Sequence, residues 1–269
     1  MLTFAIGLVL GALVGGGVRY AADAGIGWCA FFGFLAFGLF QFAVGRVLKK
    51  RVMAAMGQVQ DALTEGQKAL QQKIQRWQMR PPGSLKQAQQ EIADDTRVFV
   101  KAALARTHAL DRFRPWVPLM GRQIATARLQ LCWMIKDFKE VDALFPKALI
   151  VEPTTAAMKL ARMQMTNAPL AEITKFYNKQ VRRLKYNQNT LLAGCYSWIL
   201  VQRGEIDAAF RALTAALKNS DDATLKRNHE CLMNNRVAHF SNSGLGDAWY
   251  ALHLEEPKVH MPRTRPVYR

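Results

Sequence analysis

Two apolar runs at the start of the chain restrict its fold more than any other feature. Residues 2–18 contain no charged side chain, and residues 26–45 form a second run that only Gln41 interrupts. A helix needs about 20 residues to cross the hydrocarbon core of a bilayer, with a range of roughly 17–25. Because only residues 19–25 separate the runs, the sequence predicts an antiparallel hairpin of two membrane-spanning helices over residues 1–45. A cleaved signal peptide is the alternative for residues 1–22, although no positive segment precedes the first run.

Glycines in the hairpin predict that its two helices pack closely. Gly7, Gly11 and Gly15 recur at every fourth residue and therefore share one stripe of the first helix, and Gly33 and Gly38 are their expected counterparts in the second. Small residues let the backbones of membrane helices approach each other. The stripe would also suit packing against the spans of another protein, and glycine is common in membrane helices in general.

The net charge of +17 is concentrated outside the hairpin. Residues 46–130 carry 16 basic and 6 acidic side chains, and four of the basic ones, Arg46, Lys49, Lys50 and Arg51, directly follow the second apolar run. Positive residues are retained on the cytoplasmic side of a membrane and are attracted to its anionic lipids. We therefore expect a multi-pass inner-membrane protein with both termini in the cytoplasm and a basic cluster at the membrane surface.

A basic helical stalk is predicted after the hairpin, over residues 46–120. Apolar residues such as Val52, Val59 and Leu63 recur at helical spacing, so the second spanning helix is expected to continue out of the membrane. The sequence Pro-Pro-Gly at 81–83 ends this helix, because proline lacks an amide donor and restricts the residue before it. Ser84 and Gln87 then form a capping box for a second helix that runs to about residue 112.

The sequence repeats itself in the second half of the chain. Residues 147–153 and 215–221 are similar and lie 68 positions apart, which is twice 34. The pattern of Val141, Phe145 and Ala148 returns in Ala209, Leu213 and Ala216, and Gly204 stands where a tight turn is needed. This pattern resembles tetratricopeptide repeats, whose period is about 34 residues. The resemblance implies an α-solenoid of about four helix pairs over residues 121–257; an ordinary helical bundle is the alternative.

The same resemblance implies a binding groove, because the first helices of such repeats line a concave surface that holds peptides or other domains. In the repeat register, the expected groove residues are Gln123, Thr126, Gln130, Trp133, Leu160, Gln164, Trp198, His229 and Met233.

Sequence motifs for catalysis are not found. The chain has no phosphate-binding loop and no metalloprotease or serine-hydrolase signature, and its four cysteines and five histidines lack the spacing of a metal site. We expect no enzymatic activity, no cofactor, no metal and no small-molecule substrate. Residues 258–269 combine prolines with positive charge and predict a disordered basic tail.

Three functional hypotheses follow from this all-α organisation. The first is a membrane-anchored scaffold that recruits a protein partner at the cytoplasmic face. The second is a structural accessory subunit of an integral membrane complex, packed through the glycine stripe. The third is binding of anionic lipid or nucleic acid through residues 46–130; nucleic acid is the weaker of these two, because a nucleic-acid-binding domain should carry the positive field on its own folded surface.

Overall fold

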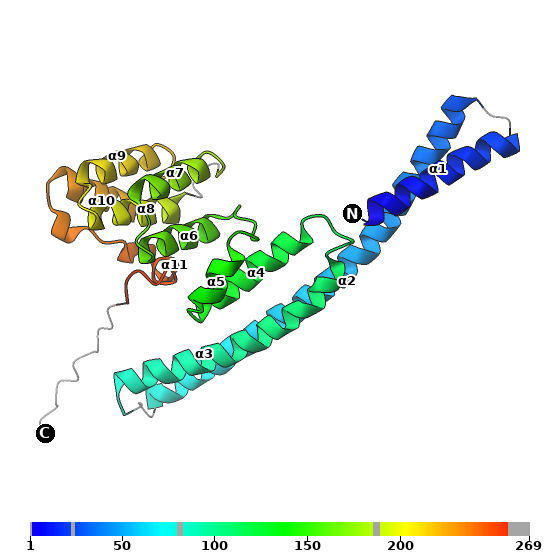
Figure 1. Cartoon of the computed structure of the whole chain (residues 1–269). Helices are drawn as coiled ribbons and strands as arrows, with labels where there is room; N and C mark the ends of the chain where they lie inside the picture. Colours follow the sequence, from blue (N-terminus) through cyan, green and yellow to red (C-terminus); the bar gives the residue numbers. More distant parts are fainter. Residues whose placement is uncertain (1, 23–24, 80–82, 185–188, 258–269) are drawn as a thin grey trace, which may run out of the picture. The chain divides into compact units, whose positions relative to one another are not determined.

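The computed structural model describes residues 2–22, 25–79, 83–184 and 189–257, and all regular elements in these ranges are helices (Figure 1). The predicted all-α fold is therefore confirmed for these residues. The chain forms two compact units, residues 1–149 and 150–269. The tail predicted at 258–269 lies outside the described residues.

Helix α1 (Leu2–Ala22) and the first part of helix α2 (Ile26–Met79) form the N-terminal hairpin (Figure 1). Both helices are long and apolar enough to cross a membrane. Many of their large apolar side chains point outward: Leu8, Phe34 and Phe42 are 64%, 78% and 68% exposed. An outer surface of this kind would be an aggregation hazard in water and is suited to contact with lipid.

The second apolar run and the first stalk helix form one continuous helix, as the sequence predicted. Helix α2 runs for 54 residues, and no proline interrupts it. Helix α3 (Leu85–Thr107) runs back along it (Figure 1). Ser84 caps α3 as expected, since its Oγ accepts a hydrogen bond from the Gln87 amide at 3.1 Å, but the Gln87 side chain bonds to Glu91 at 3.3 Å and does not complete the capping box. The α-helix ends earlier than predicted, at Thr107, and continues as a 3₁₀-helix, η1 (His108–Phe113).

Two apolar clusters hold the stalk together. Helix α4 (Met120–Met134) contributes to both, and the short α5 (Phe138–Leu144) packs on α4. The two compact units divide after Leu149, so α4 and α5, which the predicted repeat domain of residues 121–257 includes, lie in the first unit, where α4 buries apolar residues against the stalk helices. One cluster comprises Val59, Ala62, Val100, Ala103 and Leu131, and the other Ala55, Leu110, Phe113, Met120 and Ile124.

The second unit is built from five α-helices and three short turns of helix within the described residues. Helix α8 is its centre, because the side chains from Leu192 to Ser197 are all buried and α8 packs against α6, α9 and α11. The elements are α6 (Pro153–Met165), α7 (Leu170–Val181), α8 (Thr190–Gln202), α9 (Ile206–Leu217), α10 (Ala223–Met233), η2 (Val237–His239), η3 (Ser243–Leu245) and the one-turn α11 (Asp247–Tyr250).

One type of turn recurs along the chain. Helices α4, α6, α8 and α10 each end before a residue with positive φ, namely Lys136, Asn167, Gly204 and Asn235. In each turn the next residue donates its amide to the carbonyl five positions back, as Glu205 does to Leu200 at 2.9 Å. This is the Schellman geometry that closes a helix end. A helix followed by this turn therefore repeats at spacings of 31, 37 and 31 residues, and Gly204 occupies the tight turn expected for it.

The last of the expected helix pairs is not formed. Helix α10 is followed by η2, η3 and the single turn of α11, so its partner is not a regular helix. A buried polar network takes the place of helix packing: Asn228 donates to Asn242 at 2.8 Å, and Asn242 donates to the Gly194 carbonyl at 2.8 Å. Both asparagines are fully buried, and their bonds fix the loop to α8.

Candidate membrane-surface site

The beginning of α1 is hydrogen-bonded to the loop that follows η1. The Leu2 amide donates to the Pro115 carbonyl at 3.0 Å, and the Thr3 hydroxyl donates to the Trp116 carbonyl at 3.2 Å. Gln41 of α2 donates to the Thr3 carbonyl at 3.1 Å. These three contacts place the N-terminal end of α1, the end of the apolar part of α2 and the loop at one level of the first unit.

The hairpin glycines fall into two groups. A Cβ added to Gly11 would lie 2.8 Å from the Gly33 carbonyl oxygen, and one added to Gly15 would lie 2.8 Å from the Cys29 carbonyl oxygen. Gly7 faces Phe37 and Gln41 at 3.0 Å. The structure thus brings Gly7, Gly11, Gly15 and Gly33 into the α1–α2 contact. Gly38 does not take part, because an added Cβ there meets nothing within 4 Å; our expectation for Gly38 was wrong.

The four side chains of the predicted basic cluster are all exposed. At 100° per residue, Arg46, Lys49 and Lys50 share one face of α2, and Arg51 points to another. The first three line an open hollow together with Phe42 and Met53. Arg51 instead lines a different pocket, between α2 and the end of η1.

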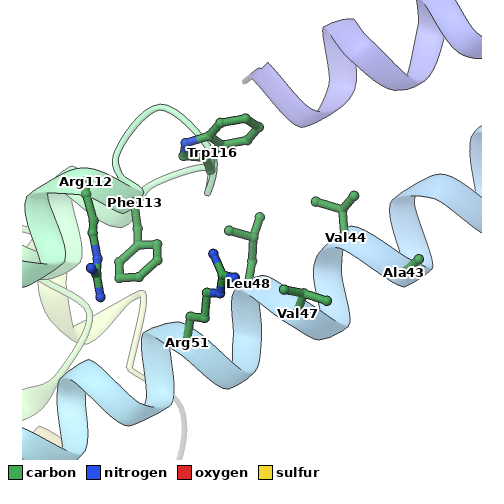
Figure 2. Close-up of a pocket in the computed structure, with 8 residues that line it drawn as sticks. All are labelled: Ala43, Val44, Val47, Leu48, Arg51, Arg112, Phe113 and Trp116. Atoms are coloured by element: carbon green, nitrogen blue, oxygen red, sulfur yellow. The ribbon is translucent and has the colours of Figure 1, made fainter.

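We call this second hollow the arginine pocket, and it combines apolar and cationic side chains (Figure 2). Its volume is about 680 Å³. Figure 2 shows Arg112 at one end, Ala43 and Val44 at the other, and the Arg51 guanidinium between them, beside Leu48. The full lining is Ala43, Val44, Val47, Leu48, Arg51, Arg112, Phe113 and Trp116.

The carboxylate nearest in sequence to Arg112 already has cationic partners. Asp111 pairs with Arg128 at 2.8 Å and with Arg114 at 2.9 Å. Burial alone would raise the pKa of Asp111, but the hydrogen bond and charge of Arg128 and the charge of Arg114 outweigh it, so its pKa lies below the ordinary 3.8. Neither Arg51 nor Arg112 has an ion pair within the part of the chain that the structure describes. Arg112 instead lies over the Phe113 ring, 4.8 Å from its centroid.

The expected groove residues of the first unit do not line a common surface. Trp133 is 1% exposed and belongs to the core, so the groove prediction is wrong for it. The Thr126 hydroxyl accepts a hydrogen bond from the Leu149 amide at 2.8 Å. Gln130 is half-buried, and Gln123 is exposed at the edge of a small pocket of about 340 Å³ that Thr3 also lines.

The expected groove residues of the second unit mostly have structural contacts. Leu160 is fully buried, so it lines no groove. Gln164 accepts a hydrogen bond from Arg203 at 3.0 Å, and Trp198 donates to Glu255 at 2.7 Å. His229 is stacked on Phe210 and hydrogen-bonded to Thr214 at 2.9 Å. Met233 is 61% exposed. The repeat register therefore does not identify a shared binding surface.

A recess that the sequence did not indicate lies among α7, α9 and the start of α8. Its volume is about 360 Å³, and alanines of α9 form part of its wall. Tyr177 and Tyr196 stack in this wall with ring centroids 3.9 Å apart, and the Tyr196 hydroxyl bonds to Thr174 at 2.9 Å. Burial, with a smaller contribution from Tyr196, raises the pKa of Tyr177 to about 12, so the Tyr177 hydroxyl stays protonated at neutral pH.

The described residues contain no group of three or more side chains that could hold a metal ion. Cys132 and Cys195 are buried, and burial raises the pKa of both thiols, that of Cys132 to about 11. A thiol held protonated in this way is a poor nucleophile.

Arg112, Phe113 and Trp116 are the site residues that sequence reasoning missed. The sequence does hold an indication of this segment, namely Trp116 between Pro115 and Pro118 and close to Arg112 and Arg114. A tryptophan beside basic residues is typical of a segment at a membrane interface. Comparisons with known proteins add no further guide, because no family model, no curated protein and no solved structure matches the chain.

Proposed function

We propose that this protein is a membrane-anchored helical scaffold whose hairpin fixes it in the inner membrane and whose second unit recruits a protein partner in the cytoplasm. The observation that carries this proposal is the continuity of α2, which passes without a break from an apolar, outward-facing segment into a stalk with a packed core. A chain of this design joins a membrane anchor rigidly to a folded aqueous part.

The dimensions of the hairpin support an orientation across the bilayer. Trp28 and Arg46 are 18 residues apart on α2, or about 27 Å at 1.5 Å per residue, close to the hydrocarbon thickness of about 30 Å. Tyr20 and Trp28, at the turn, are 96% and 63% exposed, as suits aromatic residues at an interface. Thr3 bonds to the loop beside the stalk, so the N-terminus and the stalk belong on the same side, and the basic cluster favours the cytoplasm.

Recruitment is proposed for the second unit. Three of its helices, α6, α8 and α10, end in the same Schellman turn with a positive-φ residue. This recurrence is compatible with tetratricopeptide-like stacking. The recess beside Tyr177 and Tyr196 offers a concave, partly apolar surface with polar groups at its edge, as protein-binding sites commonly do.

The competing role of accessory subunit loses its main support. The glycine stripe that would have packed against other spans is used within the chain, because Gly11, Gly15 and Gly33 bring α1 and α2 together. What remains outside is an apolar surface that lipid can cover.

Crosslinking in membranes separates the two roles. The full chain and a version ending at residue 149 are expressed at equal levels, extracted by mild detergent after crosslinking, and compared. A scaffold should retain its reproducible partners only when residues 150–269 are present. Partners held equally well by residues 1–149 would favour the accessory subunit, and release of the full chain from membranes by alkali would contradict both roles.

A further inference from the structure

The arginine pocket has the two-ended character of a lipid site. Ala43 and Val44 line the end towards the hairpin, Arg112 lies at the other end, and the Arg51 guanidinium lies between them, beside Leu48 (Figure 2). From Ala43 to Arg51 the helix rises by about 12 Å. The pocket therefore passes from apolar to cationic over the thickness of a lipid head-group region.

The cationic end is available for an anion. The neighbouring carboxylate, Asp111, is occupied by Arg114 and Arg128. Stacking on Phe113 holds the Arg112 guanidinium in place, and Phe113 itself is only 4% exposed. Arginine binds a phosphate through two parallel hydrogen bonds, so each of the two arginines that line this pocket is a candidate phosphate ligand.

The position of the pocket also fits a membrane lipid. Its apolar end adjoins residues 43–44, where the predicted span finishes, and Trp116 lies at the level where α1 begins. A lipid in the adjacent leaflet would have its acyl chains on the apolar side and its phosphate on the arginine side. The volume of about 680 Å³ lies within the usual range of roughly 300–1,000 Å³ for one bound ligand.

We propose that the arginine pocket binds one anionic phospholipid, with the phosphate held by Arg51 and Arg112 and the start of an acyl chain packed on Val44, Val47, Leu48 and Trp116. This proposal rests on the proposed membrane insertion. It goes beyond diffuse attraction of the basic cluster, because it assigns the lipid to one face of α2 and to residues 112–116, which are far apart in the sequence.

Lipid binding to the full chain in a neutral detergent tests the site, since no charged leaflet is present there. Phosphatidylglycerol or phosphatidylcholine with identical acyl chains is titrated, and bound lipids are counted by native mass spectrometry. We expect one tightly held phosphatidylglycerol. R51Q combined with R112Q should weaken it about tenfold or more, because two charge-assisted contacts are lost. The phosphatidylglycerol affinity of R51K combined with R112K should lie between that of the native chain and that of R51Q combined with R112Q. Lysine keeps the positive charge but loses the bidentate geometry.

The matched control is K49Q combined with K50Q, which removes the same charge from the other face of the same helix turn. It should change phosphatidylglycerol binding by no more than about twofold, as expected for exposed charges that lie outside the site. An equal loss in both double variants, or equal binding of phosphatidylcholine, would overturn the proposal. So would full competition by glycerol 3-phosphate, since that result would assign the site to a free phosphate.

This failure can be told apart from failure of the proposed function. If the chain resists alkali extraction from membranes but the arginine variants keep their lipid, only the lipid site is wrong. If alkali releases the chain, membrane insertion is wrong, and the lipid site falls with it.

Discussion

Both halves of α2 contain a glycine where a neighbouring helix packs closely. In one half the glycine contacts the backbone of that helix, and in the other it contacts a side chain. In the hairpin, a Cβ added to Gly33 would lie 2.7 Å from the Gly11 carbonyl oxygen, so backbone meets backbone. In the stalk, a Cβ added to Gly66 would overlap the Phe99 ring. Two helices in lipid gain no hydrophobic free energy by associating, so their association depends on close backbone packing. In water, burial of an aromatic ring stabilises the contact between two helices.

Substitution of Gly33 should produce the largest effect. In Gly33→Leu, the new side chain would meet the backbone of α1, which cannot move aside. We therefore expect the variant to destabilise the α1–α2 contact by about 3 kcal/mol or more. Cysteines introduced as Phe4→Cys and Phe37→Cys, whose native rings are 6.2 Å apart, report the contact through their yield with a short thiol crosslinker. Gly38→Leu is the matched control and should leave the yield unchanged. Equal yields in the two variants would contradict the contact.

Substitution of Gly66 should have a smaller effect, because a side chain can move where a backbone cannot. Gly66→Leu is expected to cost about 1–3 kcal/mol by displacing Phe99. Phe99→Ala in the same chain should restore part of the loss, which a double-mutant cycle measures from thermal unfolding of the full chain in mild detergent. Gly57→Leu, at a position without neighbours within 4 Å, is the control. Simple additivity of the two changes would refute the pairing.

Acid should weaken the stalk, which contains Asp111, and leave the Gly33 contact unaffected. The pKa of Asp111 lies below the ordinary 3.8 in the folded chain, so its ion pairs stabilise the fold above that pH. This stabilisation is lost as the pH falls through the lower folded value. Asp111→Asn should cost about 1 kcal/mol at pH 7, since the pair is partly exposed.

Unfolding temperatures at pH 7 and at pH 3 check this expectation. The difference between the native chain and Asp111→Asn should shrink at the lower pH, whereas Asp61→Asn, at an exposed carboxylate, should behave like the native chain at both. A difference that does not change with pH would show that the carboxylate charge is irrelevant.

Local signals in the sequence were sufficient for much of the helical framework. The apolar runs indicated the hairpin, Ser84 indicated the start of α3, and Gly204 indicated the turn between α8 and α9. Each of these features depends on residues within a few positions of one another, where side-chain and backbone chemistry act directly.

Contacts between distant segments were beyond the sequence. The space beside Gly66 is filled by Phe99, which is 33 positions away and lies on another helix, so no local pattern indicates this contact. Trp133 and Leu160 looked like groove residues, since a repeat register does not distinguish the buried side of a helix from its exposed side. The arginine pocket depends on η1 returning to α2, which no local pattern indicates.

The unbroken course of α2 has a mechanical consequence. A helix without a hinge acts as a lever: in the membrane orientation that we propose, the segment from Arg46 to Met79 extends about 50 Å beyond the membrane surface. A change of about 10° in the tilt of the spanning segment, well within the range seen for membrane helices, would move the far end sideways by about 9 Å. Bilayer thickness and lateral pressure would thus be converted into displacement at the tip of the stalk.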